Sequence, residues 1–118
     1  MNKSYTKDGF IYVEYTGDQT GESVLTTVGD LNKLIEEAKS KKRSALVICD
    51  INQVTKHDSG ARKVGQDSLR TLRYDKFAIC GGDFFTRNIV GILVKGINKT
   101  DTVKFFKTQE EAVGWLKS

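Results

Sequence analysis

The chain has 118 residues, of which 38% are hydrophobic and 29% are charged, the composition of an ordinary globular protein. No apolar run approaches the roughly 20 residues that span a bilayer, and the stretch Met1–Gly9 is polar, so we expect neither membrane insertion nor secretion. The prediction is one cytoplasmic domain over residues 1–118, in which residues 1–8 form a loose tail or an edge extension.

The formal net charge is +4, but the positive side chains are scattered apart from one basic run at residues 39–43. That run falls at the predicted end of a helix, where cations stabilise the negative end of the helix dipole. The sequence also has no nucleic-acid-binding motif and no aromatic pair interleaved with Arg or Lys. We therefore expect no nucleic acid among the partners.

The N-terminal third predicts two antiparallel strands followed by a helix. Residues 10–15 are rich in aromatic and β-branched side chains, residues 17–21 have turn chemistry, and residues 22–27 are predicted as the returning strand. The apolar residues that follow recur at helical spacing, which predicts a helix beginning at Thr27 or Gly29. The domain is thus expected to open with a hairpin.

The remainder alternates between strands and helices. Strands are predicted at 44–49, 75–80 and 102–106, and helices are predicted from Asp58 to Leu72, from 84 to 97, and from the capping box Thr108–Glu111 onward. Gly65 falls on the core face of the helix that begins at Asp58, which predicts a close approach of that helix to the sheet. The order ββαβαβαβα predicts an α/β fold, with a mixed, mostly parallel sheet of about five strands, an N-terminal hairpin and about four helices.

The predicted helix at 84–97 has an apolar arc wider than contact with one sheet requires. Its predicted core stripe is Phe85, Ile89, Ile92, Leu93 and Gly96. The residues that widen the arc, among them Phe84, Val90 and Val94, belong to the core in one interpretation. In the other they line a lipid pocket or form the interface of a homodimer.

The two cysteines, Cys49 and Cys80, fall in short apolar runs of strand length. A thiol in such a run behaves as a small buried hydrophobe. Because nothing in the sequence indicates an oxidising compartment, we expect two reduced core residues rather than a disulfide.

The stretch Asp50–Arg62 is the one polar passage between a buried strand and an amphipathic helix. In an open α/β sheet, the carboxyl end of a strand and the amino end of the next helix form the usual ligand or switch surface. We therefore predict that this stretch is a loop that carries the function. In the plainer interpretation, Asp58 or Ser59 only caps the helix.

The polar stretch also carries a family resemblance. Asp50, Val54, Asp58, Ser59 and Gly60 are spaced as Asp-x3-Val-x3-Asp-Ser-Gly, which resembles the loop pattern of STAS domains, the anti-sigma-factor antagonist (SpoIIAA-like) family. The predicted order of elements resembles that fold over most of the chain. Residues 103–116 are similar to the ending of an uncharacterised bacterial branch of these proteins, with its Phe-x-Thr-x-Glu-Glu-Ala-x-x-Trp-Leu pattern.

In the antagonists, a partner anti-sigma-factor kinase phosphorylates the serine after the motif aspartate and binds only the unmodified form. The resemblance implies a non-enzymatic regulatory protein in which Ser59 is the phosphoacceptor and Asp58 helps to position it. Its partner would be such a kinase or another signalling protein. The implied partner-binding loop consists of Asp50, Asn52, Lys56, Asp58, Ser59, Gly60 and Arg62. The antagonists usually carry a second Ser or Thr before the glycine, whereas here Gly60 follows Ser59 directly.

A phosphate on Ser59 would add about 1.5 to 2 negative charges at a helix N-terminus, where free amides and the helix dipole favour an anion. The modification is therefore expected to leave the fold intact. Its expected effect is to repel or block a partner docked on the same loop, where Asp58 is already acidic.

The run His57-Asp58-Ser59 does not predict a catalytic triad, because three consecutive side chains point in different directions and cannot converge. The sequence contains no P-loop, no dinucleotide fingerprint and no metal-ligand spacing. We therefore expect no enzyme activity, no cofactor and no metal site.

Gly81-Gly82-Asp83 is a second candidate site, because it follows a predicted strand and precedes a predicted helix. Free amides there could receive the anionic head group of a lipid or nucleotide, helped by Arg87, which would make the protein a small-ligand module. The alternative is that the two glycines form only a tight turn.

Overall fold

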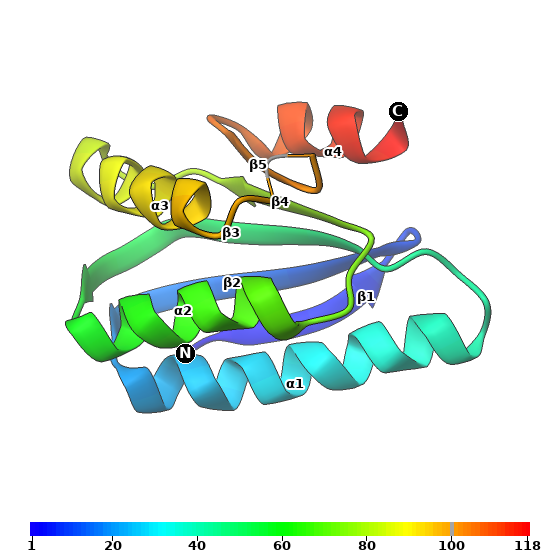
Figure 1. Cartoon of the computed structure of the whole chain (residues 1–118), viewed down its shortest axis with the longest axis horizontal. Coiled ribbons are helices and arrows are strands. Elements are labelled where there is room, and N and C mark those ends of the chain that lie inside the picture. The colour runs from blue at the N-terminus through cyan, green and yellow to red at the C-terminus, as the bar shows by residue number, and fades with distance from the viewer. Residues whose placement is uncertain (100) are drawn as a thin grey trace.

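The computed structural model describes residues 1–99 and 101–118 (Figure 1). These residues form five strands and four helices in the predicted order ββαβαβαβα. The elements are β1 (Lys3–Lys7), β2 (Phe10–Gln19), α1 (Gly21–Ser40), β3 (Leu46–His57), α2 (Ser59–Thr71), β4 (Lys76–Cys80), α3 (Phe84–Gly96), β5 (Val103–Phe106) and α4 (Gln109–Lys117).

The strands form one sheet in the order in which they occur along the chain, β1-β2-β3-β4-β5. β1 pairs with β2 in the antiparallel sense, and every later pair is parallel. The predicted α/β fold with a mixed, mostly parallel sheet is therefore confirmed.

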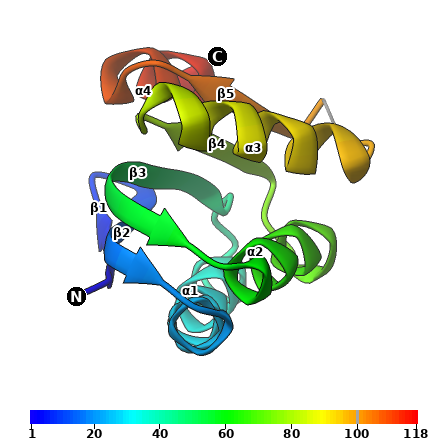
Figure 2. The same cartoon turned by 90° about the vertical axis from the view of Figure 1, so that its left-hand side faces the viewer.

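Three helices cover one face of the sheet and the fourth covers the other. The larger core joins residues of α1, α2 and α3 to the sheet, whereas the smaller core packs Ala112 and Leu116 of α4 against Ile48 and Ala78. Successive right-handed crossovers between neighbouring parallel strands place their helices on the same face. Figure 2 shows α1 and α2 side by side. Among the described residues, no helix combines the length and the apolar character needed to cross a bilayer.

The N-terminal hairpin exists, but its predicted position is wrong. Residues 3–7, predicted as part of a loose tail or an edge extension, form the edge strand β1, which pairs with β2 from Lys7 opposite Phe10 to Lys3 opposite Glu14. Asp8 and Gly9 make the turn, both with positive φ. β1 is a polar edge strand, so it lacks the apolar alternation by which a strand is recognised.

The second strand predicted for that hairpin, residues 22–27, is the beginning of α1. Thr20 is the N-cap: its hydroxyl accepts the N–H of Ser23, and the Ser23 hydroxyl accepts the N–H of Thr20. This is a capping box with Ser in place of the usual Glu or Gln. Val24, Thr27 and Leu31 then follow one another on the buried face. The predicted start at Thr27 or Gly29 was therefore several residues late.

The helix predicted at 84–97 is confirmed as α3, but the predicted core stripe is only partly right. Ile89 and Leu93 of that stripe are half-buried on the inner side of the helix. Thr86, Val94 and the C-cap Ile97 are buried, whereas Phe85 is 64% exposed and Ile92 is 67% exposed. An apolar arc that nearly surrounds a helix does not specify which side faces the sheet.

Both cysteines are buried and free, as predicted. Cys49 belongs to the larger core and Cys80 to the smaller one, so their side chains point to opposite faces of the sheet although β3 and β4 are neighbours. Burial raises the pKa of the Cys80 thiol to about 12 and also raises that of Cys49.

Candidate functional site

The polar stretch Asp50–Arg62 is largely a strand, so its prediction as a loop is wrong. β3 continues past Asp50 to His57 because β2 continues beside it, with Gly17 opposite Val54 and Gln19 opposite His57. β4 accompanies β3 only as far as Asp50. Beyond that point, β2 and β3 form a two-stranded extension that leads directly into α2.

The start of α2 is fixed by Asp58, which is the N-cap. Its carboxylate accepts the N–H of Ala61 at 2.7 Å, and its own N–H donates to the carbonyl of Gln19 at 3.2 Å. Ser59 is the first helical residue and is exposed. The side chain predicted as a phosphoacceptor therefore lies at the positive end of the helix dipole.

The N-termini of α1 and α2 meet at this point, as the end view in Figure 2 shows. An ideal Cβ built on Gly60 would lie 3.3 Å from the Cα and N atoms of Gly21. This close backbone approach accounts for glycine at both positions. It also brings the positive ends of two helix dipoles to the same edge of the molecule.

Asp50 and Asn52, at the other end of the predicted partner-binding loop, lie beside the Gly81-Gly82 turn. The Asp50 carboxylate accepts the N–H of Asn52 at 2.8 Å, and the Asn52 side-chain oxygen accepts the N–H of Gly82 at 3.2 Å. Asn52 and His57 are five residues apart along β3, whose pairing with β2 shifts register twice in this region. Asp50 and Asn52 therefore adjoin the second candidate site, while Lys56, Asp58, Ser59, Gly60 and Arg62 form a separate group around the start of α2.

The Gly81-Gly82 turn is explained by packing. Both residues have φ near +90° (+87° and +89°), and a Cβ on Gly81 would lie 2.5 Å from the Asn52 side chain. The N–H of Gly81 donates to the carbonyl of Phe106 at 3.3 Å, and that of Gly82 donates to Asn52. Both amides thus already have partners within the protein.

Asp83 follows this turn as the N-cap of α3. It accepts the backbone N–H of Thr86 at 2.7 Å, and this hydrogen bond lowers the pKa of Asp83 below its ordinary value. The charges of His57 and Arg87 contribute less to the same shift. Arg87 is half-buried, and its Nε has no hydrogen-bond partner among the described residues.

His57 joins the end of β3 to α2 and α3. Nη1 of Arg62 lies 3.0 Å from Nδ1 of His57 and donates to the His57 carbonyl at 2.9 Å. The Phe85 ring stacks on the imidazole with ring centroids 6.0 Å apart. The sequence did not indicate this role of Phe85, because it was assigned to the core.

His57, Asp58 and Ser59 do not converge. The imidazole contacts Arg62 and Phe85, the Asp58 carboxylate caps α2, and Ser59 is exposed. Among the described residues, no three His, Cys, Asp or Glu side chains are grouped so that they could hold a metal ion.

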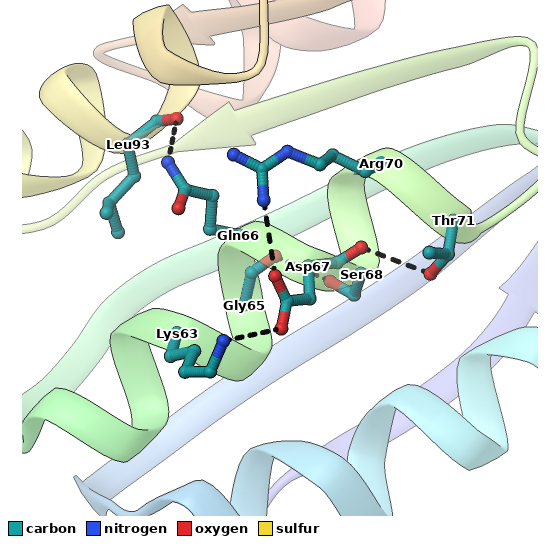
Figure 3. A network of polar contacts seen from close by, with 8 residues as sticks. All are labelled: Lys63, Gly65, Gln66, Asp67, Ser68, Arg70, Thr71 and Leu93. Carbon is teal, nitrogen blue, oxygen red and sulfur yellow. Dashed lines mark hydrogen bonds and ion pairs between the residues drawn. The ribbon is translucent and has the colours of Figure 1, made fainter.

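The side of α2 next to α3 carries a polar network (Figure 3). Asp67 pairs with Lys63 at 3.5 Å and with Arg70 at 3.3 Å, and Gln66 donates to the carbonyl of Leu93 at 3.0 Å. The two ion pairs are exposed and contribute little to stability. The Gln66 hydrogen bond is different, because it links α2 to α3.

Beneath this link lies a cavity of about 120 Å³ between α2, α3 and the sheet. Its lining is mainly apolar and includes Cys49, Ile51, Leu69, Phe77, Ile89 and Val90. The space is partly open to solvent, so it is a pocket between α2, α3 and the sheet rather than a sealed void. The core is therefore incomplete at this point.

Gly65 of α2 lines the cavity, and a Cβ built on it would meet no atom of the described residues within 4 Å. The prediction that this glycine marks a close approach of the helix to the sheet is wrong. The residue borders empty space instead.

No family model and no curated protein matches the sequence. Solved structures do match over nearly their full length. An anti-sigma factor antagonist from Mycobacterium paratuberculosis has a TM-score of 0.67 and 18% identity, over 100% of this chain and 94% of that chain. The unphosphorylated form of the anti-sigma factor antagonist SpoIIAA has a TM-score of 0.61 and 12% identity, over 100% and 99%.

A third match is an uncharacterised protein of the DUF3478 family with a SpoIIAA-like fold, from Shewanella loihica. Its TM-score is 0.58 and its identity is 15%, over 98% of this chain and 92% of that chain. These matches define the class of the molecule: it has the SpoIIAA-like α/β fold. The fold that the sequence resemblance implied is thus confirmed.

Proposed function

We propose that residues 1–118 act as one non-enzymatic regulatory domain that binds a partner protein through the surface where β3 ends and α2 begins. Lys56, Asp58 and Ser59 are exposed there, and the matching structures of known role are anti-sigma factor antagonists. The cytoplasm is the proposed compartment, because the two buried thiols are compatible with reducing conditions.

Phosphorylation of Ser59 is the proposed switch. The observation that carries this proposal is the position of Ser59, which is exposed, opens α2, and lies where the N-termini of α1 and α2 meet. A phosphate there is tolerated by the fold, because both helix dipoles favour an anion. Its charge, added beside Asp58, would repel a partner that docks on the unmodified surface.

The proposed partner is a signalling protein such as an anti-sigma-factor kinase, which would both bind and modify this surface. A second copy of the chain is also proposed, because Phe84, Phe85 and Ile92 of α3 are exposed. Sedimentation velocity of the wild type and of Phe85→Asp tests the second copy, since a dimer formed through these side chains would dissociate in the variant.

The experiment combines intact-mass analysis with binding. Intact-mass analysis of protein recovered from its host shows whether it carries a phosphate, and peptide sequencing locates the modified residue. The partner that co-purifies is then identified and expressed. Its affinity is then measured for the wild type, Ser59→Asp and Lys56→Glu. The matched control is Lys33→Glu, which places the same charge reversal on the exposed side of α1.

The proposal expects a phosphate on Ser59 and weaker binding by Ser59→Asp and Lys56→Glu, with Lys33→Glu like the wild type. Ser59 that is always unmodified, together with a Ser59→Asp variant that binds as the wild type does, would disprove the switch. If Lys33→Glu abolishes partner binding and Lys56→Glu does not, the docking surface lies on α1 rather than where β3 ends and α2 begins.

A further inference from the structure

The cavity between α2 and α3 leads to an inference that goes beyond partner binding and does not depend on it. A helix interior normally favours alanine over glycine, because glycine loses more backbone entropy on folding. A glycine inside a helix is therefore usually explained by a neighbour that leaves no room for a Cβ. Gly60 of α2 has such a neighbour in Gly21, whereas Gly65, like Gly29, Gly91 and Gly114, has none. Of these four glycines, Gly65 is the one that lines the cavity.

At Gly65 the absent side chain keeps the cavity open. The residue lies on the core-facing side of α2, one turn after Ala61 and one turn before Leu69, both of which are buried. A long aliphatic side chain such as leucine there would fill part of the cavity and would also favour the helix. The sequence thus keeps an unfavourable residue at the one place where it preserves the space.

The size and lining of the cavity limit what can enter it. Apolar cavities of about 150 Å³ remain dry and accept a molecule such as benzene. The cavity here, about 120 Å³ with walls of aliphatic and aromatic side chains, is of that order. Its inner space therefore fits a single ring or a short branched chain.

Arg62 supplies one charge at the edge of the cavity. It lines the cavity and is half-buried, and both of its contacts with His57 involve Nη1. Nη2 and Nε have no hydrogen-bond partner among residues 1–99 and 101–118. A guanidinium edge with two parallel N–H donors matches the two oxygens of a carboxylate.

We propose that this cavity binds a small carboxylic acid with an apolar body, about the size of benzoate, whose carboxylate pairs with Arg62. A side chain from a partner protein is the less favoured occupant. The cavity extends inward to Phe77 and Ile79 of β4, which are 4% exposed, so its inner wall lies within the core rather than at a surface where proteins dock.

The test uses the full chain and three probes. Amide shifts in two-dimensional NMR are followed during titration with benzoate, with its neutral counterpart benzamide, and with acetate as the head group alone. Benzoate is expected to give saturable shifts around residues 61–69 and 86–93, with an affinity at least about tenfold higher than that of benzamide. Acetate is expected to give no saturable shift there.

Two variants fill the cavity and one removes the charge. Gly65→Leu and Val90→Phe are expected to reduce benzoate affinity at least about tenfold, and Arg62→Gln is expected to abolish the preference for benzoate over benzamide. Gly29→Leu is the matched control, because Gly29 is an exposed helical glycine of α1 whose added Cβ would also meet no atom of the described residues within 4 Å. It should bind benzoate as the wild type does.

Three results would overturn the proposal. The first is the absence of saturable benzoate shifts in the wild type. The second is unchanged benzoate affinity in a folded Gly65→Leu or Val90→Phe variant. The third is an unchanged preference for benzoate in Arg62→Gln. If no acid binds and a partner protein instead loses affinity for Gly65→Leu, the cavity receives a partner side chain and the proposal fails.

Discussion

The backbones of Gly21 and Gly60 lie against each other, so that a Cβ on Gly60 would be 3.3 Å from the Cα of Gly21. The Gly21 atoms belong to the backbone and cannot move aside as a flexible side chain could. The third near atom, Oδ1 of Asp58 at 3.3 Å, is held by its hydrogen bond to the N–H of Ala61. We therefore predict that Gly60→Ala lowers the free energy of unfolding by about 1 kcal/mol or more, although alanine is the better helix former. Urea denaturation measures the change. A variant as stable as the wild type would show that the two helices can move apart enough to accommodate the methyl group at no cost.

Gly65→Ala in the same helix should have the opposite effect. Its Cβ meets no described atom within 4 Å, so only the gain in helix propensity remains. We expect the free energy of unfolding to rise by about 0.5 to 1 kcal/mol. Because Gly60→Ala and Gly65→Ala each add one methyl group to α2, comparing them separates the effect of steric crowding on stability from the effect of helix propensity. A destabilised Gly65→Ala would mean that the space beside this residue is not empty.

A negative charge should act differently at the two ends of α2. Ser59 is the first residue of the helix and Thr71 the last, and both are exposed. Ser59→Asp should raise the free energy of unfolding by about 0.3 to 1 kcal/mol, and Thr71→Asp should lower it by a similar amount. Thermal unfolding at low salt measures both. A Ser59→Asp variant that is less stable than Thr71→Asp would show that the helix dipole does not favour a negative charge at Ser59.

The sequence predicted the elements of the second half of the chain because their ends carry strong signals. Asp83 caps α3, and the capping box of Thr108 and Glu111 opens α4, as their types and spacing indicate. The first half lacked such signals. The first turns of α1 contain Val24, Thr26 and Thr27, whose β-branched side chains favour a strand, and the N-cap Thr20 is paired with a serine rather than a Glu or Gln.

At the candidate site, the sequence located the start of α2 but not the length of β3. Residues after Asp50 are polar, which is typical of a loop, and they form a strand only because β2 continues beside them. The cavity was not predictable, because it depends on how far the side chains of α2 and α3 fill the space between the helices. Gly65 was the one residue that hinted at the cavity. A glycine on the core face of a helix can mark either a close packing contact or an empty space, and the sequence does not distinguish the two.

Lys99 should stabilise the C-terminal end of α2. Its Nζ donates to the carbonyl of Leu69 at 3.3 Å and to that of Arg70 at 3.1 Å, and it lies 5.5 Å from the ring centroid of Tyr74. Lys99→Met keeps the apolar stem and removes these contacts, so we expect a loss of about 1 kcal/mol. Lys33→Met on the exposed side of α1 is the control for loss of one positive charge, and equal effects in urea denaturation would show that the position of Lys99 is unimportant.

Asp83 should make the stability of the protein depend on pH in the acid range. Its pKa lies below the ordinary value of 3.8, mainly because it accepts the N–H of Thr86, so folding favours the ionised carboxylate. The resulting stabilisation is complete above pH 3.8 and is lost as the pH falls through the lower pKa of the folded state. Asp83→Asn keeps an N-cap that accepts the same hydrogen bond but cannot titrate.

The difference in unfolding free energy between the wild type and Asp83→Asn should therefore shift in favour of the variant as the pH is lowered from about 5 to about 2. Urea denaturation across that range measures this difference, with Asp30→Asn as the control for removal of an exposed carboxylate from a helix. Curves for the wild type and Asp83→Asn that stay parallel throughout would mean that the cap at α3 contributes equally in its protonated form, and that the hydrogen bond to Thr86 does not depend on the charge of Asp83.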